Sequence, residues 1–329
     1  MAGFSRRAFL GAVASSGALA CGGAAEVAAS PRERGPVGFS IDPQRSGLRL
    51  AVPGFEGEVR VCLVADSHLA LRDARDASHS DFCSRMAQWP GSPKEFSAIL
   101  ARARKGKSDL VALAGDIISF PTLANVEFVA RELEKCGMDW MYTAGNHDWD
   151  FEGDAGSDAE KRERWIARRL GPLYRGAVPL MSSKVVKGVR FVAIDNSTYN
   201  VTSEQLAFWR EEAAKPEPVV LLMHIPLWFE GFGVCTCGNP SWGAATDQTW
   251  RIERRERWAE RQSRETFEFR EAVVSARNLV AVFTGHEHRW LFAGERGRLF
   301  LSIPKSAQGF SLDVRIVGAP LPGLQGQLN

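Results

Sequence analysis

The fold is indicated most clearly by residues 59–68, which read VRVCLVADSH. A short apolar run that is rich in Val and Leu is typical of a buried strand in an α/β protein. This run ends directly in Asp66-Ser67-His68, so polar groups follow the strand. Four later apolar runs end in the same way, at 110–114 before Gly115-Asp116, 138–143 before Gly145-Asn146-His147-Asp148, 219–223 before His224, and 279–284 before Gly285-His286-Glu287-His288.

Helical patterns separate these runs, which indicates a layered α/β domain. Gly137 is predicted to cap one helix, and two pairs of residues have the spacing of capping boxes. The capping pairs are Ser157 with Glu160 and Thr202 with Gln205. The remaining predicted elements are strands at 189–194, 298–302 and 310–317 and a charged helix over 249–276.

The composition fits one large soluble domain or two smaller ones. Of the 329 residues, 45% are hydrophobic and 24% are charged, as in ordinary globular proteins. The formal net charge of +2 gives no reason to expect nucleic acid or an anionic membrane surface as a partner. Because no linker or repeat divides the chain, we expect one domain over 58–329, preceded by a leader and a first strand over 31–57. Residues 30–39 are interpreted as exposed.

The N-terminus resembles an export signal. Arg6-Arg7 precedes an uncharged run of about ten small residues, too short for a bilayer span of about twenty. We interpret residues 1–30 as a twin-arginine signal, which predicts a periplasmic or extracellular protein. Cleavage after Ala20 or Ala29 is favoured, and lipid attachment at Cys21 is the alternative. A cytoplasmic protein with a frayed basic N-terminus is the weaker interpretation.

Histidines are concentrated at the predicted strand ends. Five of the six histidines lie there, and only His79 does not. Imidazole nitrogen with carboxylate oxygen suits Zn, Fe, Mn or Ni, whereas Ca or Mg prefers oxygen alone. Because the clusters contain no cysteine, a closed structural zinc site is disfavoured. The pattern therefore predicts a catalytic metal site.

The number of candidate ligands exceeds what one ion can use while keeping positions for water and substrate. Two ions fit if a carboxylate bridges them, and Asp116 is the natural bridge because Gly115 permits close approach. Two metals about 3.5–4 Å apart suit in-line displacement at phosphorus. The candidate ligands are Asp66, His68, Asp116, Asn146, His224, His286 and His288.

The ordered motifs resemble the calcineurin-like metallophosphoesterase superfamily, in the phosphodiesterase-like branch whose last motif is GHxH. The resemblance covers roughly residues 58–305. It implies a four-layer α/β/β/α sandwich of two mixed sheets with the site along one edge. It also implies that Asp66, His68, Asp116 and His288 hold one metal and that Asp116, Asn146, His224 and His286 hold the other.

This resemblance leads to an expected mechanism. A metal-bridging hydroxide, formed because the cations lower the pKa of their shared water, attacks phosphorus. His147 is expected not to bind metal but to protonate the leaving alkoxide. Asp148 is expected to orient the His147 ring, and a surface turn residue is the alternative for Asp148.

The substrate is predicted to be a small phosphoester, a monoester or diester such as a nucleotide. Ala144 stands where protein serine/threonine phosphatases carry Arg, which disfavours a phosphoprotein. Insertions at 69–93 and 228–250 are expected to form the substrate wall, with Arg85 for phosphate and Trp242 for stacking, beside a contact from Asn146. The alternative is that both insertions are packed surface loops. A nucleotide pyrophosphohydrolase or nuclease is the second enzyme hypothesis, and a non-catalytic scaffold the third.

The cysteines leave one question open. Cys62 lies in an apolar run and is predicted to be a buried hydrophobic residue. Cys235 and Cys237 fit a disulfide role, free thiols or, least well, a metal pair, because no second CxC or CxxC supplies further ligands.

Overall fold

The computed structural model describes residues 36–42, 46–88, 90–151, 153–227, 263–318 and 326–327. Several predictions from the sequence lie outside these residues. They concern the export signal over 1–30 with Cys21, the cysteines Cys235 and Cys237, Trp242, and the first part of the charged helix, 249–262.

The first sheet contains seven strands in the described chain, in the order β13-β1-β2-β12-β3-β4-β5. Its central strands β3, β4 and β5 are parallel, and β12 runs antiparallel to β3. The sheet is therefore mixed, as predicted. The strands are β1 (Gly38–Asp42), β2 (Gly47–Val52), β3 (Glu58–Val64), β4 (Leu110–Ala114), β5 (Trp140–Thr143), β12 (Leu312–Gly318) and β13 (Gly326–Gln327).

The second sheet contains six described strands, in the order β10-β11-β9-β8-β7-β6. Four of them, β7, β8, β9 and β11, are parallel, while the two edge strands pair antiparallel. The strands are β6 (Met181–Val186), β7 (Val189–Ile194), β8 (Val219–Leu222), β9 (Leu279–Thr284), β10 (Leu291–Glu295) and β11 (Arg298–Ser302).

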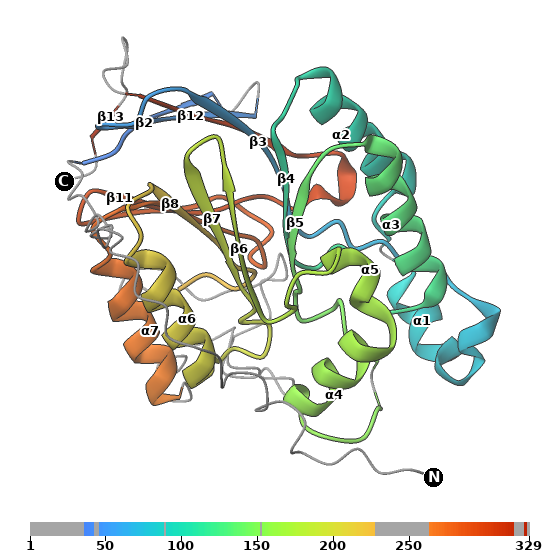
Figure 1. Cartoon of the computed structure of the whole chain (residues 1–329). Helices are drawn as coiled ribbons and strands as arrows, with labels where there is room; N and C mark the ends of the chain where they lie inside the picture. Colours follow the sequence, from blue (N-terminus) through green and yellow to red (C-terminus); the bar gives the residue numbers. More distant parts are fainter. Residues whose placement is uncertain are drawn as a thin grey trace, which may run out of the picture.

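Helices cover the outer face of each sheet, and the inner faces pack on one another (Figure 1). One apolar cluster fills the space between the sheets, a second lies under α2 and α3, and a third lies under α6 and α7. The fold is thus the predicted four-layer α/β/β/α sandwich. The helices are η1 (Ala74–His79), α1 (Ser80–Met86), α2 (Pro93–Lys105), α3 (Leu123–Cys136), α4 (Asp158–Trp165), η2 (Ile166–Leu170), α5 (Gly171–Tyr174), α6 (Ser203–Ala213), α7 (Arg264–Val274) and η5 (Ser306–Gln308).

Local sequence signals placed several elements correctly. β4, β7, β9 and β11 occupy the predicted residues. Both predicted capping boxes are present, at the start of α4 and of α6. Gly137 ends α3 with φ 70°, a left-handed conformation that glycine adopts without a steric penalty.

The structure differs from the sequence prediction at the N-terminal side of the domain. Residues 38–52 form two strands, not one, and Val37 is only 1% exposed, so the interpretation of residues 30–39 as exposed is wrong for the part that is described. β1, β6 and β10 share one cause for being missed. They are partly buried edge or near-edge strands and so lack a continuous apolar run.

Two further findings concern the described part of the chain. Cys62 is a buried free thiol, as predicted, and so are Cys83 and Cys136. None of the described helices combines the length and the apolar character that crossing a membrane requires.

Candidate metal centre

The predicted ligands come together because the parallel strands of both sheets end at one edge. Asp66 follows β3 and Asp116 follows β4, and the backbone N–H of Asp66 donates to the carbonyl of Gly115 at 3.0 Å. In the second sheet, the N–H of Gly285 donates to the carbonyl of His224 at 3.0 Å. These bonds hold the loops after neighbouring strands side by side.

The backbone at these strand ends is unusual. Five of the predicted ligands have positive φ, a conformation that costs a residue with a β-carbon about 1–2 kcal/mol. Such strain persists where the surrounding structure fixes it, and it is concentrated at functional sites. The five are Asp66 (φ 54°), His68 (φ 45°), Asp116 (φ 51°), His286 (φ 71°) and His288 (φ 54°).

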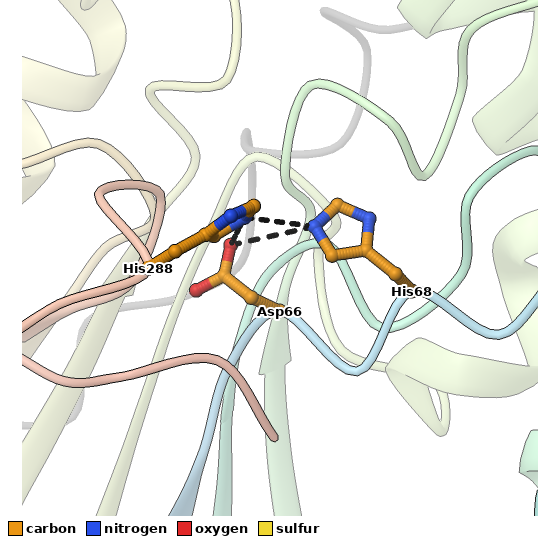
Figure 2. Close-up of side chains that lie close together, drawn as sticks. All are labelled: Asp66, His68 and His288. Atoms are coloured by element: carbon orange, nitrogen blue, oxygen red, sulfur yellow. Dashed lines mark hydrogen bonds and ion pairs between the residues drawn. The ribbon is translucent and has the colours of Figure 1, made fainter. Parts of the chain in front are cut away.

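One group of ligands joins the first and second sheets. His68 Nε2 lies 3.0 Å from His288 Nε2, and His288 Nε2 lies 3.3 Å from Asp66 Oδ1. Figure 2 shows the three side chains converging from separate loops. Two nitrogens bound to one ion at about 2.0–2.1 Å are themselves about 2.9–3.4 Å apart, so this spacing fits shared coordination.

A second group surrounds Asp116. Asp116 Oδ2 lies 3.2 Å from His224 Nε2, and ligand atoms of Asp116, His224 and His286 all lie within 4.8 Å of one another. The same Oδ2 lies 3.8 Å from Nε2 of His68, which belongs to the first group. Asp116 therefore stands between the two groups.

Hydrogen bonds to the backbone orient these ligands. Nδ1 of His224 lies 2.9 Å from the carbonyl of Ala114, so the proton belongs on Nδ1 and Nε2 faces Asp116. Both carboxylate oxygens of Asp66 accept from the N–H of His286, at 3.1 and 2.9 Å.

Asn146 follows β5 and supplies an oxygen that has no other use in the described structure. Its Oδ1 atom is buried and accepts no hydrogen bond from any described residue. A buried acceptor left without a donor costs about 1–3 kcal/mol, and such groups are rare unless an ion or water satisfies them. An amide oxygen in this position is suited to bind a cation.

The glycines of the motifs permit the close approach of these loops. A Cβ atom on Gly115 would lie 2.6 Å from His224 Nδ1, and one on Gly145 would overlap the Asp116 carboxylate. A Cβ atom on Gly285 would overlap the Asp66 carboxylate. The glycine in each of the three motifs is therefore required by sterics.

The electrostatics of the site favour ligands that are ready to bind a cation. Burial lowers the pKa of His68 and of His286 well below the ordinary value, so both rings are neutral. Burial opposes the charged form of His224 as well, but the adjacent Asp116 carboxylate outweighs it and raises the pKa of His224 to about 10. Burial also opposes ionisation of Asp116, yet the neighbouring histidines hold its pKa well below the ordinary value.

These residues fit divalent transition-metal ions. Two carboxylates that are at most 1% exposed face imidazole nitrogens and an unsatisfied amide oxygen. Buried carboxylates require a compensating charge, and this set of nitrogen and oxygen donors is the kind that Zn, Fe or Mn binds.

Comparison with known proteins agrees with this geometry. Residues 59–290 match the family model described as calcineurin-like phosphoesterase. The chain belongs to this family. It is accordingly a metal-dependent phosphoester hydrolase.

The phosphoesterase is also similar to solved structures, at low identity. A dimetal phosphatase from Danio rerio is 12% identical, with 76% of this chain and 88% of that chain covered and a TM-score of 0.48. A purple acid phosphatase from yellow lupin, Lupinus luteus, is 12% identical, with 86% and 50% covered and a TM-score of 0.49. The phosphoesterase thus spans half of the lupin chain. The search of curated proteins found no match.

His147 lies beside the Asp116 group. Its backbone N–H donates to Asp116 Oδ1 at 2.8 Å, and its ring packs edge-on against the His68 ring, with centroids 5.0 Å apart. Its ring offers a nitrogen within 4.8 Å of ligand atoms of His68 and Asp116. The ring is half-buried, so a substrate on the metals can reach it.

Asp148 has a different position from the one predicted. It is fully buried, so it is not a surface turn residue. Its Oδ2 accepts from the N–H groups of Asp116 and Gly145, at 2.9 and 2.7 Å, and its Oδ1 accepts from the N–H of Ile118 at 2.9 Å. The carboxylate is turned toward the backbone around Asp116, and among the described residues it forms no hydrogen bond with the His147 ring.

This position predicts that Asp148→Asn lowers the free energy of unfolding by about 1–3 kcal/mol, because one of the backbone N–H groups then faces an amide NH₂. Urea denaturation of the metal-free protein measures the change, and Asp313→Asn on exposed β12 is the control. Unchanged stability with an altered pH profile of kcat would instead support the predicted role in orienting His147.

The first predicted insertion, 69–93, is folded against the domain. The N–H of Gly91 donates to the carbonyl of His68 at 2.8 Å, so the insertion starts and ends beside the site. Arg75, one of its arginines, pairs with Asp73 and Glu127 at 2.6 and 2.8 Å. Arg85 lies exposed on α1, 6.0 Å from the Phe82 ring, and its predicted contact with substrate phosphate stays a prediction.

A sixth polar strand end was missed by the sequence analysis. Asp195, Asn196 and Ser197 follow β7 as the other clusters follow their strands. Asp195 pairs with buried Arg162 at 3.2 Å, and the Asn196 amide bonds both backbone groups of Ile225, at 2.7 and 3.0 Å. Because Ile225 follows His224, this cluster fixes the backbone of a predicted ligand.

Proposed function

We propose that this phosphoesterase hydrolyses a small phosphomonoester or phosphodiester with two divalent transition-metal ions, Mn, Fe or Zn. Asp66, His68 and His288 would hold one ion, and Asn146, His224 and His286 the other, with Asp116 between them. The observation that carries the proposal is the position of Asp116 Oδ2, 3.8 Å from His68 Nε2 and 3.2 Å from His224 Nε2.

When bound, the two cations supply a water of lowered pKa as nucleophile and polarise the phosphoryl oxygens. The chain's own residues set the geometry for this chemistry. The backbone bonds to Asp66 and His224 fix where the phosphoryl group binds, because they prevent the ligands from rotating. Asn146, at the edge of the group, is also placed to contact a substrate oxygen.

His147 is proposed to give the leaving alkoxide its proton from an imidazole nitrogen. Its half-buried ring stands next to Asp116 and His68, so a proton held there is close to a phosphoester on the metals. Asp148 acts one step away, by fixing the backbone N–H groups of Asp116 and Gly145.

We also propose that residues 1–30 direct twin-arginine export, with lipid attachment at Cys21 as the alternative. The paired arginines and the uncharged run that follows them support this proposal.

Metal removal and reconstitution test the proposed function. Protein treated with a chelator is expected to lose hydrolysis of both 4-nitrophenyl phosphate and bis(4-nitrophenyl) phosphate, and Mn, Fe or Zn is expected to restore it with about two ions per chain. The ratio of the two activities then assigns monoesterase or diesterase. Full activity in metal-free protein, or no activity after any reconstitution, would contradict the proposal.

A further inference from the structure

Trp290 is an exposed aromatic residue at the rim of the metal centre. It follows His288 by two residues, and 37% of its surface is exposed. Strand register places it at the edge, because Leu291 pairs with Ser302 in β11, which pairs with Thr284 at the end of β9. Trp290 therefore lies level with the turn that carries His286 and His288.

A residue of the first sheet fixes the orientation of the Trp290 ring. Phe310 packs edge-to-face on Trp290, with centroids 5.6 Å apart and planes at 89°. Phe310 ends a segment that crosses the end of β3, where the N–H of Ser306 donates to the carbonyl of Ala65 at 2.8 Å. Ala65 precedes Asp66, so the aromatic pair adjoins the first ligand group.

A second aromatic pair extends this surface away from the metals. Phe292 points to the same side of β10 as Trp290, because side chains two residues apart share a face of a strand. Phe292 is 43% exposed, and its ring lies 5.0 Å from that of Phe39 on β1. Exposed aromatic residues that gather beside a polar site mark a binding surface more often than isolated ones do.

Positive charge accompanies this surface. Arg289, adjacent to Trp290, has a side chain that is 47% exposed and lies 3.4 Å from Glu287. Lys305 is exposed next to Ser306 and forms no ion pair with any residue in the described ranges. A ligand at this rim would therefore meet metals and cations at its phosphate and aromatic rings at its organic part.

We infer that Trp290 and Phe310 form a platform that binds a flat aromatic group esterified to the substrate phosphate. This inference rests on the proposed function and narrows its substrate to aromatic phosphoesters. Stacking on an exposed ring favours a planar group over a saturated one of equal size, by about fivefold or more in affinity. Trp290 thus determines specificity, while the metal ligands and His147 perform the hydrolysis.

Matched esters test the platform. Benzyl and cyclohexylmethyl phosphates differ in planarity but have alcohol leaving groups of similar acidity, and each is assayed as monoester and as methyl diester with metal-loaded protein. The wild type is expected to show a kcat/KM ratio of benzyl to cyclohexylmethyl of about five or more. Trp290→Ala should lower this ratio to about one, whereas Trp290→Phe should keep most of it.

A matched control and a binding measurement separate the possible failures. Phe267 is 39% exposed on α7, outside the site, so Phe267→Ala should keep the wild-type ratio. Calorimetry should show that benzylphosphonate binds the wild type about fivefold more tightly than it binds Trp290→Ala. Equal ratios in wild type and Trp290→Ala would overturn the platform even if hydrolysis is normal. Benzylphosphonate binding that depends on Trp290, without hydrolysis of any ester, would support the platform and overturn the proposed function.

Discussion

Asp116→Asn is expected to reduce metal content from about two ions per chain to below one and to lower kcat/KM by more than about a hundredfold. The asparagine keeps the shape of the side chain but loses the charge that faces both His68 and His224. Loss of a partner outside the ligand set already costs about 10–100-fold in metal affinity or activity, and a bridging carboxylate should cost more.

Metal analysis of purified variants, followed by steady-state kinetics, measures this effect. Asp313→Asn, an exposed carboxylate on β12, is the matched control and should leave both values unchanged. A variant at Asp116 that still binds two ions and keeps its activity would show that this carboxylate is not the bridge.

His147→Ala is expected to keep about two ions per chain and to lose about 10²–10⁴-fold in kcat for an alkyl phosphoester. The alkoxide of such an ester must be protonated as it leaves, and the variant has no imidazole to supply the proton. A 4-nitrophenyl ester should be affected much less, because its phenolate leaves without protonation.

Comparison of the two esters in wild type and variant separates the roles of His147. His79→Gln is a control, because His79 is bound to Asp154 and stacked on Phe151 away from the metal groups. If metal content falls together with activity on both esters, His147 is a ligand, as its place beside His68 and Asp116 would also permit.

The sequence was informative where long-range geometry follows from a local pattern. An apolar run marks a buried strand, and parallel strands end at the same edge, so the residues after β3, β4, β8 and β9 could be predicted to meet. The same rule applied to Asp195 after β7, but its ion pair with Arg162 depends on α4, whose position the local pattern does not reveal.

Side-chain direction was beyond the sequence analysis. Asp148 is adjacent to His147 in the chain, which suggested contact, yet its carboxylate turns back to the N–H groups of Asp116, Ile118 and Gly145. Arg75 counted as a free cation in the insertion until the structure showed its pairs with Asp73 and Glu127.

Exposure was equally hidden in the sequence. Trp290 stands in an ordinary aromatic position after the last motif, and only its place before the edge strand β10 leaves the ring accessible. An edge strand is recognised by which strands pair with it, and that pairing is decided by residues distant in the chain.

The central claim is that Asp116 lies between two metal ions. A crystal structure of Mn-reconstituted protein, with anomalous difference maps, tests it most directly. The account predicts two peaks about 3.5–4 Å apart, one beside Asp66, His68 and His288 and the other beside Asn146, His224 and His286, with the Asp116 carboxylate touching both. A single peak, or two peaks that do not share Asp116, would contradict the account.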